Sequence, residues 1–237
     1  MNEISEYPPY PVKWPLMFQN WDRLTFLHWR YPADVIRALV PSELEIDTFD
    51  GAAWIGLTPF LLTGLRPPFL PALPWISQFP EMNVRTYVCG PDGERGIWFF
   101  SLEADRLAAV AGARLSYGLP YRWADMRVRW DATQVEYTSR RHTGRGQARI
   151  VVRRGSPLKV GERERFLTAR FRLYTILAGR LGFAQIAHEP WPLESAALLK
   201  LDQDVIEHSN VPGPSGEPLV YFSPTLSVRI GRPKFLR

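Results

Sequence analysis

Short runs that alternate apolar and polar residues, rather than long helical repeats, dominate the chain. Residues 82–88 and 96–102 flank the turn sequence Pro91-Asp92-Gly93-Glu94 and predict a β-hairpin. Alternation along its first strand places Met82, Val84, Thr86 and Val88 on one face. The opposite face then carries Glu81, Asn83, Arg85 and Tyr87, so one side of this strand is polar and ionisable.

Similar patterns predict further strands. Residues 44–49 and 52–62 flank an Asp50-Gly51 turn and predict a second hairpin. Residues 135–139 and 147–153 flank a glycine-rich turn and predict a third. Single strands are predicted near residues 126–130, 196–201 and 226–230. Together these elements indicate an α+β chain that is mainly β.

Three segments predict helices. Residues 32–40 begin with Pro32 and end before Pro41, residues 105–115 are alanine-rich, and residues 163–181 form the longest candidate. In this longest segment Phe166, Leu173, Ile176, Leu177 and Leu181 recur at near-helical spacing. Residues 1–20 are rich in proline and aromatic residues and predict an irregular arm, so the helix at 32–40 is the first regular element expected.

Residues 67–75 read Pro-Pro-Phe-Leu-Pro-Ala-Leu-Pro-Trp and predict an apolar loop, because each proline removes a backbone hydrogen-bond donor. An exposed apolar patch of this kind is a liability for a protein in water. We therefore expect the loop either to cover the mouth of a cavity or to form a subunit contact. The second alternative would make the protein a homo-oligomer.

Length and composition fit one globular domain over residues 1–237, with 46% hydrophobic and 22% charged residues. The uncharged runs at 51–65 and 67–80 are shorter than the roughly 20 apolar residues that a membrane-spanning helix needs. The N-terminus lacks the pattern of a signal peptide. A single cysteine, Cys89, fits a reducing compartment. We therefore expect a cytoplasmic protein without membrane contact.

The formal net charge is +5, and only four of the 29 basic residues are lysines, at positions 13, 159, 200 and 234. The arginines of residues 140–154 form either a solvated hairpin rim or, as the weakest functional alternative, a contact for nucleic-acid phosphates. No aromatic platform accompanies them in that segment. Phosphate-loop, dinucleotide and nucleophile-elbow motifs are absent, and the four histidines lack metal-ligand spacing. We therefore expect neither a metal nor a cofactor.

The polar strand face has two interpretations. It is either the solvated side of an open sheet or the lining of a cavity inside a closed sheet. In the second case Glu81 and Arg85 would address the same ligand, because a buried charge is costly unless it is paired.

Several strings recur in one order along nearly the whole chain: His28-Trp29, Phe49-Asp50-Gly51, Glu81-x-Asn83-x-Arg85-Thr86-Tyr87-Val88, Phe99-Phe100-Ser101-Leu102-Glu103, Leu119-Pro120-Tyr121 and Trp191-Pro192-Leu193. This ordered set resembles the YqjF-like family, domain of unknown function 2071, in the acetoacetate decarboxylase-like superfamily. The resemblance implies a cone-shaped, mostly antiparallel β-barrel with a few helices packed outside and an internal cavity. It thus favours the cavity interpretation.

In the decarboxylases of that superfamily, a Gly-x-Pro-Lys-Lys turn supplies the lysine that forms a Schiff base with a β-keto acid. The matching turn here is Gly118-Leu119-Pro120-Tyr121-Arg122, with Tyr121 in place of the nucleophilic lysine. The resemblance also implies that Glu81 matches the cavity carboxylate. Schiff-base decarboxylation is therefore not expected.

The resulting hypothesis is a cavity protein for a small organic acid. It would be either a lysine-independent lyase or isomerase, or a non-catalytic binding or interaction module. Glu81 is the candidate proton-transfer residue and Tyr121 a hydrogen-bond donor. Arg85 or Arg114 would hold the carboxylate. Further candidates around the ligand are Asn83, Arg122, His28 and His188.

Overall fold

The computed structural model describes residues 4–236, and within helix α2 it describes only the backbone of residues 108, 109 and 113–115. In this part of the chain the strands are β1 (Met17–Tyr31), β2 (Glu45–Ile46), β3 (Ala53–Arg66), β4 (Phe79–Cys89), β5 (Arg95–Ala104), β6 (Tyr121–Trp130), β7 (Gln134–Arg141), β8 (Gln147–Pro157), β9 (Arg172–Leu177), β10 (Arg180–His188), β11 (Glu194–Gln203), β12 (Leu219–Ile230) and β13 (Lys234–Phe235). The helices are α1 (Ala33–Arg37), α2 (Leu107–Tyr117), α3 (Glu162–Thr168) and a 3-10 turn at Glu207–Ser209. Within residues 4–236, no helix is long and apolar enough to cross a membrane.

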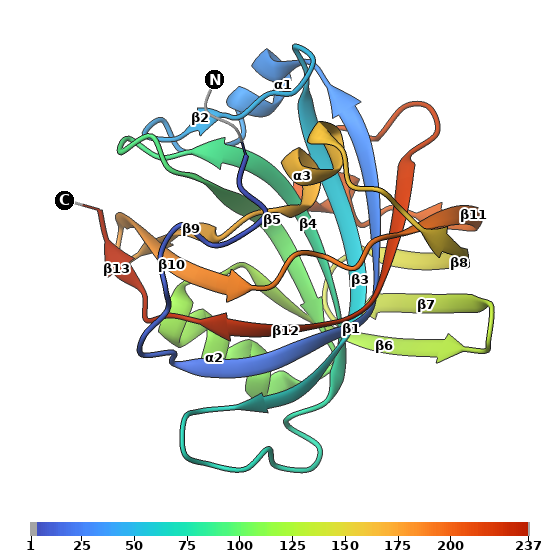
Figure 1. The fold of residues 1–237 in the computed structure, drawn as a ribbon, viewed down its shortest axis with the longest axis horizontal. Helices are drawn as coiled ribbons and strands as arrows, with labels where there is room; N and C mark the ends of the chain where they lie inside the picture. The colour runs from blue at the N-terminus through green and yellow to red at the C-terminus, as the bar shows by residue number, and fades with distance from the viewer. Residues whose placement is uncertain (1–3, 237) are drawn as a thin grey trace.

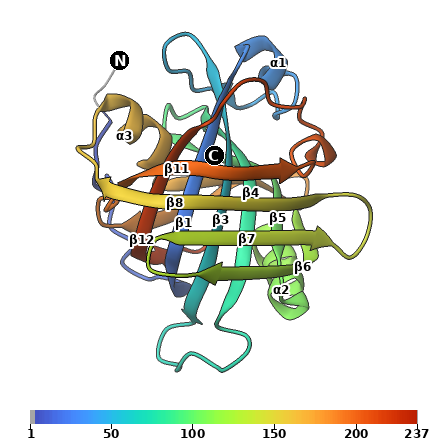
Figure 2. The same cartoon turned by 90° about the vertical axis from the view of Figure 1, so that its right-hand side faces the viewer.

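Nine strands close a barrel in the order β5-β6-β7-β8-β11-β12-β1-β3-β4, with β4 pairing back to β5. Strands β9 and β10 bridge β5 to β12 on the other side, so β1, β3, β4 and β12 form a sheet that is covered on both faces (Figures 1 and 2). Most pairs are antiparallel, while β5 runs parallel to β6 and to β9. This mixed β-barrel with few helices confirms the predicted fold class.

Two hydrophobic clusters fill the space on either side of the shared sheet. Phe26 and Tyr87 belong to the cluster that packs against β9, β10 and α3. Val84 and Leu27 belong to the cluster that packs against β6, β7 and β8. Successive residues of β4 thus face different layers, which confirms the alternation predicted for this strand. Residues of β1 also divide between the two layers. Because both layers exclude solvent, the polar face of β4 is buried rather than solvated.

Most predicted elements are present with shifted ends. The helices at 32–40 and 105–115 correspond to α1 and α2, and the hairpins at 82–102 and 135–153 correspond to β4–β5 and β7–β8. The apolar segment at 67–75 is a loop between β3 and β4.

The hairpin predicted around Asp50-Gly51 is wrong in its pairing. The turn exists, with positive φ at both residues and a bridge between Phe49 and Ala52. However, β2 pairs with the end of β4, and β3 pairs with β1 and β4. The first ten residues of β3 are buried, as expected for a central strand with a partner on each side.

The long helix predicted at 163–181 is also wrong, because α3 ends at Thr168 and β9 and β10 follow. Ala178 and Gly179, both at positive φ, form the turn of this hairpin. The apolar residues of 163–181 have near-helical spacing, but the pairing of β9 with β5 overrides it. This pairing joins β9 and β10 to the rest of the sheet.

The predicted arm at 1–20 is too long, because β1 already begins at Met17 and is the first regular element. Aromatic and leucine side chains of β1 divide between the two hydrophobic clusters. A strand that is buried on both faces lacks the clear alternation that sequence patterns reveal.

The turn before β6 predicts a test of this packing. Gly118 and Gly144 both have positive φ, but a Cβ at Gly118 would lie 2.4 Å from the Ile176 carbonyl oxygen, whereas Gly144 faces open space. Gly144→Ala should cost about 1 kcal/mol for its backbone conformation. Gly118→Ala should cost about 2 kcal/mol more, because the clash is with backbone. Denaturant unfolding measures both, and equal losses would contradict the packing at Gly118.

Candidate functional site

Three neighbouring strands bring His28, Gly56 and Arg85 into one row on the buried polar face. His28 of β1 lies opposite Gly56 of β3, which lies opposite Arg85 of β4. A Cβ at Gly56 would lie 3.1 Å from His28 Nε2 and 3.3 Å from Arg85 Cγ. Glycine therefore leaves the space that both side chains use. His28 is 1% exposed and Arg85 is 5% exposed, so this row lies inside the protein.

A hydrogen-bond chain determines which nitrogen of His28 is available. The Tyr87 hydroxyl donates to the Leu167 carbonyl at 2.6 Å, at the end of α3, and lies 2.6 Å from His28 Nε2. Because the tyrosine proton is used on the carbonyl, Nε2 carries the hydrogen that joins the two side chains. Burial and the nearby Arg85 charge lower the pKa of His28 well below its usual value. His28 is therefore neutral, and its Nδ1, which is buried and has no partner among the described residues, is a hydrogen-bond acceptor.

Arg85 is a buried cation without a carboxylate partner in the described part of the chain. Its Nη2 makes only two 3.4 Å contacts, to the Tyr87 hydroxyl and the Leu167 carbonyl, and its Nε has no partner. The Phe26 ring lies 5.3 Å from its guanidinium carbon.

The nearby Arg170, by contrast, is fully paired. Its Nη1 lies 2.6 Å from Asp47 Oδ2, and its Nε and Nη2 donate to the Phe166 carbonyl. Arg170 thus has a carboxylate partner and Arg85 has none among the described residues. This difference is important because a buried charge costs several kcal/mol unless it is paired.

A carboxyl group lies at the other end of the polar face. The Tyr121 hydroxyl donates to Glu81 Oε2 at 3.0 Å. Burial, with a smaller contribution from Glu103, raises the pKa of Glu81 to about 8. Burial and Glu81 also raise the pKa of Tyr121 well above its usual value. Both groups are therefore protonated at neutral pH, and Glu81 is an acid about four strand residues, roughly 13 Å, from Arg85.

Thr58 and Asn83 lie between these two ends. They are opposite each other on β3 and β4, and both are buried. Thr58 Oγ1 and Asn83 Oδ1 have no hydrogen-bond partner among the residues that the structure describes. Buried polar atoms are paired in most proteins, and exceptions call for an explanation. With His28 Nδ1 and Arg85 Nε, this face holds four buried polar atoms that have no hydrogen-bond partner among the described residues.

The other predicted site residues lie outside this row. His188 packs among Trp21, Phe171 and Trp191, donates from Nδ1 to the Glu189 carbonyl at 2.7 Å, and has its pKa lowered to about 4 by burial. Arg122 is exposed, because it alternates with Tyr121 along β6. Arg114 lies in α2, and its side chain is outside the described residues.

The arginines of residues 140–154 are partly neutralised by carboxylates. Arg141 is buried and pairs with Glu103 at 2.5 Å, Arg149 pairs with Glu136 at 2.7 Å, and Arg154 pairs with Glu194 at 2.8 Å. Arg149 and Arg154 are partly exposed, as a solvated hairpin rim predicts, whereas Arg141 is not. The ion pairs leave fewer free charges for nucleic-acid phosphates.

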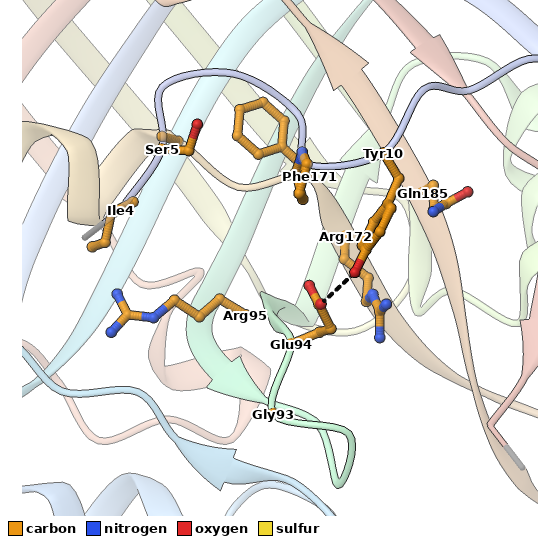
Figure 3. Close-up of a pocket in the computed structure, with 11 residues that line it drawn as sticks. Ile4, Ser5, Tyr10, Gly93, Glu94, Arg95, Phe171, Arg172 and Gln185 are labelled. Atoms are coloured by element: carbon orange, nitrogen blue, oxygen red, sulfur yellow. Dashed lines mark hydrogen bonds between the residues drawn. The ribbon is translucent and has the colours of Figure 1, made fainter. Parts of the chain in front are cut away.

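A separate pocket of about 290 Å³ lies under the N-terminal arm, beside the turn between β4 and β5 (Figure 3). The Tyr10 hydroxyl donates to Glu94 Oε1 at 3.1 Å across it. Its arginines have acidic partners, since Arg172 lies 2.6 Å from Asp92 and Arg95 lies 3.6 Å from Asp47. This pocket therefore lacks the unpaired charge that distinguishes the interior cluster.

Comparison with solved structures defines the class of fold. The chain superposes with a TM-score of 0.68 on the enduracididine biosynthesis enzyme MppR complexed with pyruvate, covering 97% of this chain and 93% of that one at 14% identity. An acetoacetate decarboxylase from Legionella pneumophila matches with a TM-score of 0.65, over 97% and 92% of the two chains at 14% identity. An acetoacetate decarboxylase-like enzyme from Sphingomonas wittichii RW1 matches at 0.67, over 97% and 96% at 13% identity. The fold is thus acetoacetate decarboxylase-like.

Sequence comparison defines the family. Residues 18–227 match the model of DUF2071, described as an uncharacterized conserved protein. The uncharacterized protein YqjF of Bacillus subtilis strain 168 is 39% identical over 212 residues, which cover 88% of this chain and 87% of that protein. The chain therefore belongs to the DUF2071 family, as its ordered motifs predicted.

Comparing two arginines by mutation tests whether Arg85 lacks a protein counterion. Arg170→Met should lower the free energy of unfolding by about 3 kcal/mol, because it removes the 2.6 Å partner of buried Asp47 and leaves only Arg95, at 3.6 Å. Arg85→Met should leave that free energy unchanged or raise it by about 1 kcal/mol or more, because it removes an unpaired charge. Denaturant titrations of protein refolded without small molecules measure both. A loss for Arg85→Met as large as for Arg170→Met would show that Arg85 has a structural counterion.

Proposed function

We propose that this protein binds a small carboxylic or keto acid at the polar face of β4 and acts on it as a lyase or isomerase that needs no Schiff-base lysine. The observation that carries the proposal is the buried, unpaired guanidinium of Arg85. A carboxylate that binds it in bidentate fashion would supply the missing counterion. The solved structure of MppR with pyruvate, in the same fold, supports a small acid as the class of ligand.

The row of residues supports a proton-transfer reaction on the bound acid. With the carboxylate on Arg85, the rest of the molecule extends past Thr58 and Asn83 toward Glu81. There the protonated Glu81 carboxyl, hydrogen-bonded by Tyr121, donates a proton to a carbonyl oxygen. The proton on the neighbouring carbon passes to water, because His28 Nδ1 lies in the row of Arg85, at the far end of the polar face. Transfer of both protons converts a keto acid into its enol without a covalent intermediate.

The absence of a suitable lysine supports this lysine-independent chemistry. The four lysines are at positions 13, 159, 200 and 234, and Tyr121 occupies the position that the decarboxylase turn gives to its nucleophile. Tyr121 has no amine and cannot form a Schiff base. Because its pKa is raised well above the usual value, its hydroxyl stays protonated and acts as a hydrogen-bond donor. The alternative is a non-catalytic protein that binds the same acid at the same residues.

Binding measurements test the role of Arg85. Calorimetry or native mass spectrometry with a panel of keto, hydroxy and unsaturated acids of increasing chain length should detect a ligand, and the corresponding methyl esters should bind more weakly. Arg85→Met should weaken acid binding about 10- to 100-fold, the value of a charge-assisted hydrogen-bond pair. Arg95→Met, in the pocket under the N-terminal arm, is the matched control and should bind normally. Unchanged affinity in Arg85→Met would refute the proposed carboxylate site.

Deuterium exchange distinguishes an enzyme from a binding protein. In deuterated water the protein should catalyse exchange of the C–H hydrogens next to the carbonyl of the bound keto acid, followed by NMR. Glu81→Gln should lower the exchange rate about 10²- to 10⁴-fold while binding persists. The wild-type rate should fall as pH rises through about 8, because only the protonated carboxyl donates.

Glu94→Gln, which changes a carboxylate outside the cluster, is the control and should exchange at the wild-type rate. Binding without exchange in the wild-type protein would favour the non-catalytic alternative.

A further inference from the structure

The loop between β3 and β4 exposes large apolar side chains. It projects from the barrel at the bottom of the views in Figures 1 and 2. Phe69 is 96% exposed and Trp75 is 84% exposed, and Leu70, Leu73 and Ile76 are about half exposed. Residues 67–80 carry no charged side chain. An uncharged patch of this kind on a soluble protein indicates an interaction surface.

The backbone holds the two aromatic side chains in a specific outward arrangement. Phe69 and Trp75 both have positive φ, at 66° and 75°. This backbone conformation is unfavourable for bulky residues. Hydrogen bonds hold the loop in place, from Ser77 N to the Leu73 carbonyl at 3.1 Å and from Arg106 Nε to the Trp75 carbonyl at 2.8 Å. The fold thus stabilises an unfavourable backbone whose result is the exposure of two aromatic rings.

An apolar pocket lies beside these rings. It has a volume of about 440 Å³, and its lining includes Leu16, Met17, Leu65, Leu73 and Ile76, with Arg66 the one charged residue. The loop and the start of β1 form its walls. The same loop therefore carries two exposed aromatic side chains and lines an apolar hollow of about 440 Å³.

We propose that this surface is the contact of a symmetric homodimer, in which the Phe69 and Trp75 side chains of each copy pack on the apolar pocket of the other. A two-fold contact needs a surface that is complementary to itself. The exposed aromatic rings and the apolar pocket would give the loop region this property. With Arg66 as its one charged residue, the surface matches the apolar centre of homodimer interfaces, in which charged residues are depleted but arginine is tolerated.

The available area fits a stable dimer. Burying one aromatic side chain removes roughly 150–250 Å² from water, so Phe69 and Trp75 supply on the order of 400 Å² per copy. A standard interface buries roughly 800 Å² per partner, so the half-exposed Leu70, Leu73 and Ile76 and the pocket walls would have to contribute the other half.

Molar mass in solution tests this proposal. Light scattering coupled to size exclusion, over a range of protein concentrations, should give twice the 27.3 kDa chain mass for the wild type. The double variant Phe69→Ser, Trp75→Ser should give the single-chain mass, with unchanged circular dichroism because neither side chain is in the core. The apolar replacements Phe69→Leu and Trp75→Phe should keep the dimer. Trp130→Ser, which removes a half-exposed tryptophan of β6 that does not line the pocket, should also keep it.

Two results would overturn the proposal. The first is a wild-type protein that is monomeric at all concentrations, including one that instead binds vesicles of neutral lipid through this loop. The second is a folded Phe69→Ser, Trp75→Ser variant that remains dimeric.

Discussion

A guanidinium buried inside a β-barrel loses its hydration and needs a negative charge in return. Arg85 is in this position, and within residues 4–236 the structure supplies it with two long hydrogen bonds but no carboxylate. The surrounding groups are arranged consistently with that need. His28 is kept neutral, Glu81 is kept protonated, and neither competes for the guanidinium. The polar face is thus electrostatically incomplete at one position, and a bound carboxylate would complete it.

The double-layered architecture makes this arrangement possible. Strands β1, β3 and β4 are covered on both faces, so side chains that would be solvated in an open sheet are enclosed between the layers. Where the same fold needs charges for structure alone, it pairs them, as in Arg170 with Asp47 and Arg141 with Glu103. This contrast is why we propose Arg85, and not Arg170 or Arg141, as the arginine that binds a ligand. Gly56 has an equally local role, because its missing side chain lets His28 and Arg85 share one row.

The sequence predicted the β4–β5 hairpin and the division of β4 into two faces, because turn residues and period-two alternation are local signals. It predicted the family from ordered motifs and so the barrel. It could not predict that residues 172–188 form a hairpin, since the pairing of β9 with β5 is non-local and overrides near-helical spacing. Among the site residues, Glu81, Asn83, Arg85 and His28 lie on the buried polar face. Thr58, Gly56 and the Leu167 carbonyl were missed, because their place in the site depends on strand register and on where α3 ends.

The most direct test of the central claim is a crystal structure of the protein grown near neutral pH with a keto acid that it binds. We expect the ligand carboxylate on the guanidinium of Arg85, within hydrogen-bond distance of Nε and Nη2. We also expect the Tyr121–Glu81 hydrogen bond to be intact. A structure in which Arg85 pairs with an ionised protein carboxylate, or in which the acid binds under the N-terminal arm beside Arg95 and Arg172, would contradict this claim.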